Sequence, residues 1–271
     1  MHCKKMLYVW SILWITIINT SPLRSAFEYP GPGWPSATGN IRSIGGMHPA
    51  RLLVNPALIR TDGNSHFSIQ YHKPFIGLDL NAGSVAALSY LRGQPVVSGI
   101  EYFGDDIYRE WKITAGSSWR VEDQFRIGTS FSYHQLDLAQ LDPRRSLTVS
   151  ASLFIALSDN FQIGSVLANL IQVNKDLKVP QNFQWGVQYL SEPVILLAGV
   201  EKEAALPLEI CLGMLYSPRI GLEIGMGYRD FSGSMSAGWR LLFQSYALSY
   251  NCVMHPELPV SHGLGVELIL P

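Results

Sequence analysis

The charged residues of this 271-residue chain recur in a pattern that a binding site or a transport path could use. Several fall within short segments in which apolar residues alternate with small or polar ones: Glu101, Lys112, Arg126, Glu201, Glu209, Glu223, Arg240 and Glu267. Alternate side chains of a strand point to opposite faces, so these charges share a face with glycine and serine. They could line a solute path. They could also pair with one another, because a narrow space penalises an unpaired charge.

The other reactive residues form weaker patterns. Asp105 and Asp106 offer adjacent carboxylates, but Ca²⁺ or Mg²⁺ needs further oxygen ligands, so a solvated loop is the simpler interpretation. No histidine or cysteine spacing is typical of a metal site, and we predict neither a metal nor a cofactor. Ser65 and His66 leave a hydrolase open as a third functional class, although nothing in the sequence supplies the geometry of a nucleophile and its base.

The elements that must position the charges are strands, and residues 219–241 show them most clearly. Alternate positions from Ile220 to Tyr228 are apolar, the intervening positions are glycine or charged, and the alternation resumes after a turn at 230–233. Arms of about 8–11 residues are close to the length that crosses a bilayer when tilted. Similar segments occur at 66–71, 84–91, 96–103, 111–119, 124–134, 147–157, 161–167, 183–189, 194–201, 208–216, 243–250 and 264–270.

Together these segments predict an all-β fold, a transmembrane antiparallel up-and-down β-barrel of about 14 strands (between 12 and 14). Short turns alternate with mostly longer connections, as in outer-membrane barrels. A secreted β-sandwich or lipocalin-like barrel also explains the alternation, but it needs only about seven to nine strands and turns its apolar face inward. Aromatic residues are expected to form girdles at the membrane boundaries: Tyr71, Tyr90, Trp111, Trp119, Tyr133, Tyr189, Tyr216 and Tyr250.

Composition narrows the functional classes. The chain is 47% hydrophobic and 15% charged, yet after residue 20 it has no apolar run of the roughly 18 residues that a membrane-spanning helix needs. A formal net charge of −1 argues against a nucleic-acid partner. The first residues, with Lys4 and Lys5 before an apolar stretch, are typical of a secretion signal. Cys211 and Cys252 would remain after export, and a bridge between them is open but unsupported.

The predicted organisation is a signal peptide at 1–26, an N-terminal periplasmic or luminal segment at 27–62, and the barrel at 63–271. The first half of the middle segment is rich in Gly, Pro and Ser, and Pro cannot donate to a strand ladder. The lumen of the barrel is the expected place for such a segment. It ends near Asn55-Pro56-Ala57, although Asn before Pro is also an ordinary way to open a turn.

Two short motifs resemble known families. Gly45-Gly46-Met47 followed by Asn55-Pro56-Ala57 resembles the start of FadL-like and PorV/PorQ-like outer-membrane proteins, in which a Met-Gly-Gly-type stretch precedes an Asn-Pro-Ala motif. The segment 99–110 looks like the Phe-Gly…Tyr-x-Glu segment of the PorV/PorQ-like family. This chain departs from the pattern in the order around Gly45-Gly46-Met47, and His48-Pro49-Ala50 stands where acidic residues are often seen.

The resemblance implies a fourteen-strand barrel in the bacterial outer membrane, with Asn55, Pro56 and Ala57 as a candidate luminal gate or plug. It implies a non-enzymatic PorV/PorQ-like protein that acts in protein secretion, such as type IX secretion, or in surface attachment. The implied partners are outer-membrane lipid and secretion-machinery or exported proteins. The alternative is a FadL-like channel for the uptake of hydrophobic small molecules.

Overall fold

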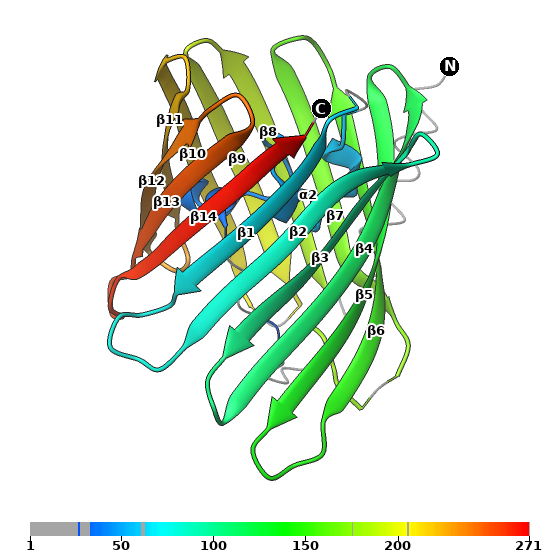
Figure 1. The fold of residues 1–271 in the computed structure, drawn as a ribbon, viewed down its shortest axis with the longest axis vertical. Helices are drawn as coiled ribbons and strands as arrows, with labels where there is room; N and C mark the ends of the chain where they lie inside the picture. Colours follow the sequence, from blue (N-terminus) through cyan, green and yellow to red (C-terminus); the bar gives the residue numbers. More distant parts are fainter. Residues whose placement is uncertain (1–26, 28–32, 61–62, 175, 205, 271) are drawn as a thin grey trace.

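The computed structural model describes residue 27 and residues 33–60, 63–174, 176–204 and 206–270. The predicted signal peptide at 1–26 lies outside the described residues. Fourteen strands form one closed antiparallel barrel in which each strand pairs with its neighbours in sequence and β1 pairs with β14 (Figure 1). Among the described residues no helix is long and apolar enough to cross a membrane.

The strands are β1 Ser65–Lys73, β2 Asn81–Leu91, β3 Gln94–Gly104, β4 Tyr108–Glu122, β5 Phe125–Leu138, β6 Arg144–Ala156, β7 Phe161–Gln172, β8 Asn182–Ser191, β9 Val194–Glu203, β10 Leu208–Arg219, β11 Leu222–Arg229, β12 Ser234–Leu242, β13 Tyr246–Met254 and β14 Ser261–Leu270. The predicted barrel and its strand number are confirmed. β11 and β13 begin two or more residues later than predicted. Gly221 has a left-handed φ of 84° in the turn before β11, and Phe243 lies in the connection before β13.

The two faces of the barrel differ as the alternation predicts. Exposed apolar side chains such as Ile69, Ile113 and Phe131 form the outer face, whereas serine, glycine and charged residues face the lumen. The lipid bilayer can therefore solvate the outer face. Tyr90 is an exception to the predicted girdle. Its side chain turns inward, packs against the luminal core and donates its hydroxyl to the carbonyl oxygen of Arg60 at 2.8 Å.

The two rims of the barrel also differ. At the rim where β14 ends, turns such as 92–93, 123–124 and 192–193 are tight. At the opposite rim the longer connections 74–80, 173–181 and 255–260 join the strands, and β4, β5 and β6 extend farthest there (Figure 1). Outer-membrane barrels have short periplasmic turns and longer outer loops, so the first rim is periplasmic.

A segment before the barrel lies inside it, and we refer to residues 33–60 as the plug. It consists of the 3₁₀ helix η1 Trp34–Thr38, the α-helix α2 Pro49–Leu52 and the 3₁₀ helix η2 Pro56–Leu58. η1 packs against β10 to β13, α2 against β1 to β3, and η2 against β4 to β6. The short blue helices therefore sit within the ring of strands (Figure 1).

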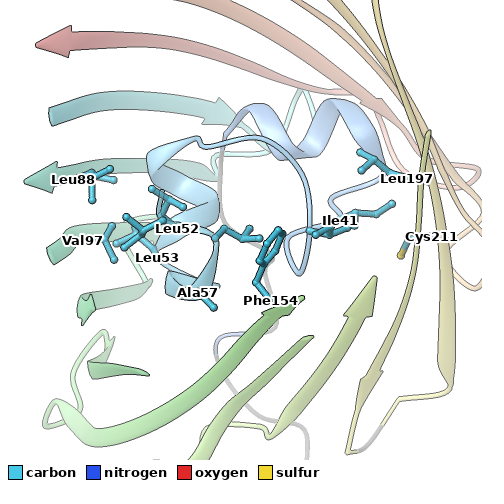
Figure 2. Packing of buried hydrophobic residues seen from close by; sticks show 13 residues of the cluster. Ile41, Leu52, Leu53, Ala57, Leu88, Val97, Phe154, Leu197 and Cys211 are labelled. Atoms are coloured by element: carbon cyan, nitrogen blue, oxygen red, sulfur yellow. The ribbon is translucent and has the colours of Figure 1, made fainter. Parts of the chain in front are cut away.

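An apolar cluster joins the plug to the wall. Plug residues such as Ile41, Leu52 and Leu53 meet Val97 and Phe154 of the barrel (Figure 2). These side chains are among the few large apolar groups that point into the lumen. Their burial holds the plug against the wall, at a gain of roughly 25 cal/mol for each Å² of apolar surface removed from water.

Candidate functional site

Hydrogen bonds within the plug fix its shape. Arg51 is 1% exposed, and it donates from Nε to the carbonyl oxygen of Ile41 at 3.2 Å and from Nη1 to that of Gly46 at 3.1 Å. Asn55 donates from Nδ2 to the Ser43 carbonyl oxygen at 2.6 Å and accepts from Ala57 N at 3.1 Å. These bonds close the loop between η1 and η2. Arg51 joins α2 to residues 41 and 46, and Asn55 joins the start of η2 to residue 43 and caps that helix.

His48 begins α2. Its Nδ1 accepts the backbone N–H of Ala50 at 3.2 Å, which caps the helix. Burial in the plug lowers the pKa of His48 to about 3, an effect that the nearby Arg240, Arg51 and Arg42 reinforce and Glu267 opposes. The imidazole is therefore neutral at neutral pH, which leaves Nδ1 free to accept.

Small residues on the inner wall create the space that the plug occupies. A Cβ at Gly164 of β7 would overlap the carbonyl oxygen of Ser43, and a Cβ at Gly128 of β5 would lie 2.5 Å from Ala57 N. A Cβ at each of several further wall glycines would lie within 3.1 Å of a plug atom: Gly116, Gly186, Gly213, Gly225, Gly227 and Gly238. The glycine-rich luminal face is thus the surface against which the plug backbone packs.

A network of charges occupies the periplasmic end of the lumen. Arg240 donates to Glu223 at 3.1 Å and to Glu267, and Glu267 also meets His66 Nδ1 at 2.8 Å. These residues come from β12, β11, β14 and β1, so the network ties non-adjacent strands together. Burial makes each charge depend on its partners, because an isolated charge in this setting is costly.

The outer side of the plug is hollow. A cavity of about 200 Å³ lies between the plug and the walls formed by β3 to β11, and its lining mixes aromatic, serine and charged side chains. Arg42 and Leu53 of the plug form its floor. We call this space the outer chamber. A second cavity of about 220 Å³, lined mainly by serines with His72 and His255, lies nearer β12 to β14.

Ion pairs cross the outer chamber. Lys112 Nζ lies 2.9 Å from Glu101, with Arg42 of the plug 3.9 Å away on the same carboxylate. Arg229 binds Glu201 at 3.0 Å and also binds Glu209. Lys112 and Arg42 share one carboxylate, and Arg229 binds two, so the ion pairs form two small networks rather than isolated bridges.

Glu201, Glu209 and Cys211 place their ligand atoms within 4.8 Å of one another, which a metal could use. Arg229 contacts both carboxylates, and its positive charge already satisfies them. The arrangement is that of an ion-pair network. Cys211 and Cys252 are both free thiols.

An outer loop folds over the mouth of the chamber. The β6–β7 register shifts between Val149 and Ala151, and Asn169 on β7 adopts a left-handed φ of 57°. From there the loop 173–181 turns inward and buries Leu177 and Val179 against Leu136 of β5. Because β7 leaves the regular ladder at this point, the loop can form part of the chamber wall.

Phe27 fills the apolar recess that this loop creates. Its ring packs with Leu136, Leu177 and Val179 and meets the His134 ring edge-on, with centroids 4.7 Å apart. Its backbone N–H donates to Oε1 of Glu110 at 2.8 Å. Tyr108 Oη donates to the same carboxylate oxygen. One residue thus combines an aromatic contact with a hydrogen bond to a buried carboxylate.

The predicted site residues divide between these regions. Glu101, Lys112 and Glu201 line the outer chamber, and Glu223 and Arg240 belong to the periplasmic network. Arg126 lies with its guanidinium 4.2 Å from the centre of the Phe154 ring. Asn55, Pro56 and Ala57 lie in the plug, fully buried against β4 to β6.

Sequence reasoning missed Phe27, Glu110 and His134 as chamber residues. Glu110 lay within the motif 99–110, but nothing marked it as luminal. The alternation from Tyr108 to Thr114 could have placed it on the same face as Lys112. Phe27 could not have been found, because no strand pattern surrounds it.

Comparison with solved structures shows which proteins have a similar fold. No family model and no curated protein matches the sequence. The fold is similar to that of the Ralstonia pickettii toluene transporter TbuX (TM-score 0.70, 10% identity, covering 91% of this chain and 100% of that one). It is also similar to the Pseudomonas putida toluene transporter TodX (0.64, 12%, 91% and 100%) and to a Pseudomonas aeruginosa FadL homologue (0.59, 10%, 92% and 98%).

The protein is therefore an outer-membrane β-barrel of a bacterial cell, with a lumen that holds its own N-terminal segment. More particularly, its fold is FadL-like, and the proteins that share it are described as transporters or channels rather than enzymes. The comparisons support the FadL-like part of the predicted resemblance. They give no support to a specific PorV/PorQ relationship or to type IX secretion.

Proposed function

We propose that this protein is a non-enzymatic outer-membrane channel that takes small, largely apolar molecules from the cell surface into the outer chamber and passes them inward. The observation that carries the proposal is a hollow chamber on the outer side of a plug, within a FadL-like barrel. A small-molecule pocket in a barrel is expected near its mouth.

The plug would act as the barrier between chamber and periplasm. It fits closely against glycines of many strands, so a solute path inward requires the plug to shift or to change shape. Asn55, Pro56 and Ala57 would belong to the moving part, because Asn55 holds the loop that carries η2. The lumen-lining charges Glu101, Lys112 and Glu201 would line the entry side.

A disulfide that fixes the plug to the barrel wall tests the proposal; we call it the pin. Ala37 in η1 has its Cβ 3.1 Å from the Cβ position of Gly225 on β11, which is close enough for the double substitution Ala37→Cys and Gly225→Cys to form a disulfide after small adjustment. Uptake of a radiolabelled small aromatic solute would be followed in cells that express either protein. We expect uptake with the wild type, loss of uptake in the oxidised variant, and recovery on reduction.

Three results would count against the proposal. Equal uptake by cells with and without the protein would remove the channel function. Deletion that depletes surface proteins while uptake is unchanged would favour the secretion role that the PorV/PorQ resemblance implies. Uptake that persists when the pin disulfide is formed would show that solutes pass inward without any movement of η1 away from β11.

A further inference from the structure

The outer chamber presents hydrogen-bond acceptors and negative charge. Among its described lining residues, five are glutamates and three are arginine or lysine. The three cations already share the carboxylates of Glu101, Glu201 and Glu209. The excess of glutamates over cations gives the lining a negative formal charge, which favours ligands of positive charge.

His134 adds a ring nitrogen that can accept a hydrogen bond, and the hydrogen bonds around the ring show which nitrogen carries the proton. Asn169 donates from Nδ2 to the Pro180 carbonyl oxygen at 2.7 Å, so its Oδ1 faces Thr148 and accepts that hydroxyl at 2.9 Å. Thr148 has no second proton, and it must therefore accept from His134 Nε2, which is 3.0 Å away. Nε2 of His134 therefore carries a proton, and in the neutral ring Nδ1 carries the lone pair. The side chain is 1% exposed, and Nδ1 has no hydrogen-bond partner among the described residues.

Phe27 shows which chemistry fits this recess. Its nitrogen reaches Glu110, and two carbons separate that nitrogen from a phenyl ring that packs on His134 and Leu136. Cleavage after the predicted signal peptide at 1–26 would make this nitrogen the charged amino terminus of the mature protein, and the nitrogen, the two carbons and the ring then have the skeleton of 2-phenylethylamine. An ammonium would make a charge-assisted hydrogen bond to Glu110, about twice as strong as the neutral one.

We propose that the outer chamber selects small aromatic or aliphatic amines, holding the ammonium on Glu110 and the apolar body in the recess that Phe27 occupies. The inference rests on the proposed uptake function, because it names the substrate class of that chamber. The volume of about 200 Å³ is below the roughly 300–1,000 Å³ of drug-sized sites, which limits the ligand to small molecules. Phe27 would leave when the ligand enters.

Calorimetry on the purified full-length mature protein in detergent tests the selection. The probes are 2-phenylethylamine, its neutral counterpart 2-phenylethanol and the anion phenylacetate. We expect the amine to bind at least tenfold more tightly than the alcohol, and phenylacetate more weakly than either. Phe27→Ala should raise the affinity for the amine several-fold, because the tethered residue no longer competes.

Glu110→Gln should abolish the preference for the amine and leave the affinity for the alcohol unchanged. Glu122→Gln, at the exposed end of the same strand, is the matched control and should behave as the wild type. Equal affinities for amine and alcohol, or a preference that survives in Glu110→Gln, would overturn the inference. If solute uptake persists in that case, the channel function stands and only the amine selection fails. Amine binding without any uptake would contradict the channel alone.

Discussion

The two halves of the lumen use similar side chains to opposite effect. On the periplasmic side, wall glycines such as Gly164 and Gly128 admit the plug backbone, and Arg240 is locked between two carboxylates. On the outer side, Arg229 is also bound by two carboxylates, but serines and glutamates surround an open chamber. The contrast shows that the inner wall determines where the plug fills the lumen. A glycine lets the plug backbone lie against the wall, whereas a larger polar residue keeps the plug away and leaves a cavity between them.

The largest expected effect comes from breaking the same kind of charge network in each half. Arg240→Gln removes the cation from the buried carboxylate of Glu267 and from the partly exposed carboxylate of Glu223, and it should lower the free energy of unfolding by about 3–5 kcal/mol, chiefly through Glu267. Arg229→Gln leaves Glu201 and Glu209 beside a cavity that water can enter, so about 1–2 kcal/mol is expected. Urea unfolding in detergent, followed by tryptophan fluorescence, measures both. Equal losses would show that the outer chamber is as dry as the plug region.

The next effect concerns the fit between plug and wall. Gly164→Ala places a methyl group against the Ser43 carbonyl oxygen, and it should destabilise the seated plug by up to about 3 kcal/mol. Gly46→Ala is the matched control, because a Cβ there meets nothing within 4 Å. Limited proteolysis of the plug and conductance across a planar bilayer would report the change. Unchanged protection in Gly164→Ala would mean that the plug can settle elsewhere in the lumen.

A smaller effect is expected at Asn55, which links the two arms of the plug. Asn55→Ala removes the bond to the Ser43 carbonyl oxygen, whereas Ala57 N keeps a contact with Ser152 Oγ at 3.3 Å. The expected cost is about 1–2 kcal/mol. If Asn55 belongs to a gate, brief conductance openings should also become more frequent. Asn160→Ala in an exposed turn is the control, and a stability loss without openings would reduce Asn55 to a structural role.

The sequence predicted the barrel well because its signal is local. Alternation between neighbours such as Ile113 and Thr114 fixes which side chain faces lipid, and no distant contact is needed to read it. Tyr90 shows the limit of aromatic type as a guide: its place in the alternation puts it inward, where it bonds to Arg60. The girdle prediction ignored that position and was wrong there.

The site was harder to predict, because strand register and the path of the plug decide it. Arg229 meets Glu201 only because three strands align at one height, and Phe27 meets Glu110 across 83 positions of sequence. Neither contact can be predicted from the spacing of residues along the sequence. The glycines were visible as a property of the luminal face, but their partners in the plug were not.

Acid should destabilise the seated plug through His48, which caps α2. The pKa of His48 in the fold is about 3, below the roughly 6.5 of an unfolded chain, so its contribution to stability is complete above about pH 6.5 and declines as the pH falls toward 3. The cause is burial, which keeps His48 neutral in the fold down to about pH 3, whereas the unfolded chain takes up a proton below about pH 6.5. With these pKa values a loss of about 2 kcal/mol is expected between pH 7 and pH 5, measured from the urea midpoint. Asn also caps helices but does not titrate, so His48→Asn should remove that part of the acid sensitivity, and an identical pH profile would place the sensitive group elsewhere.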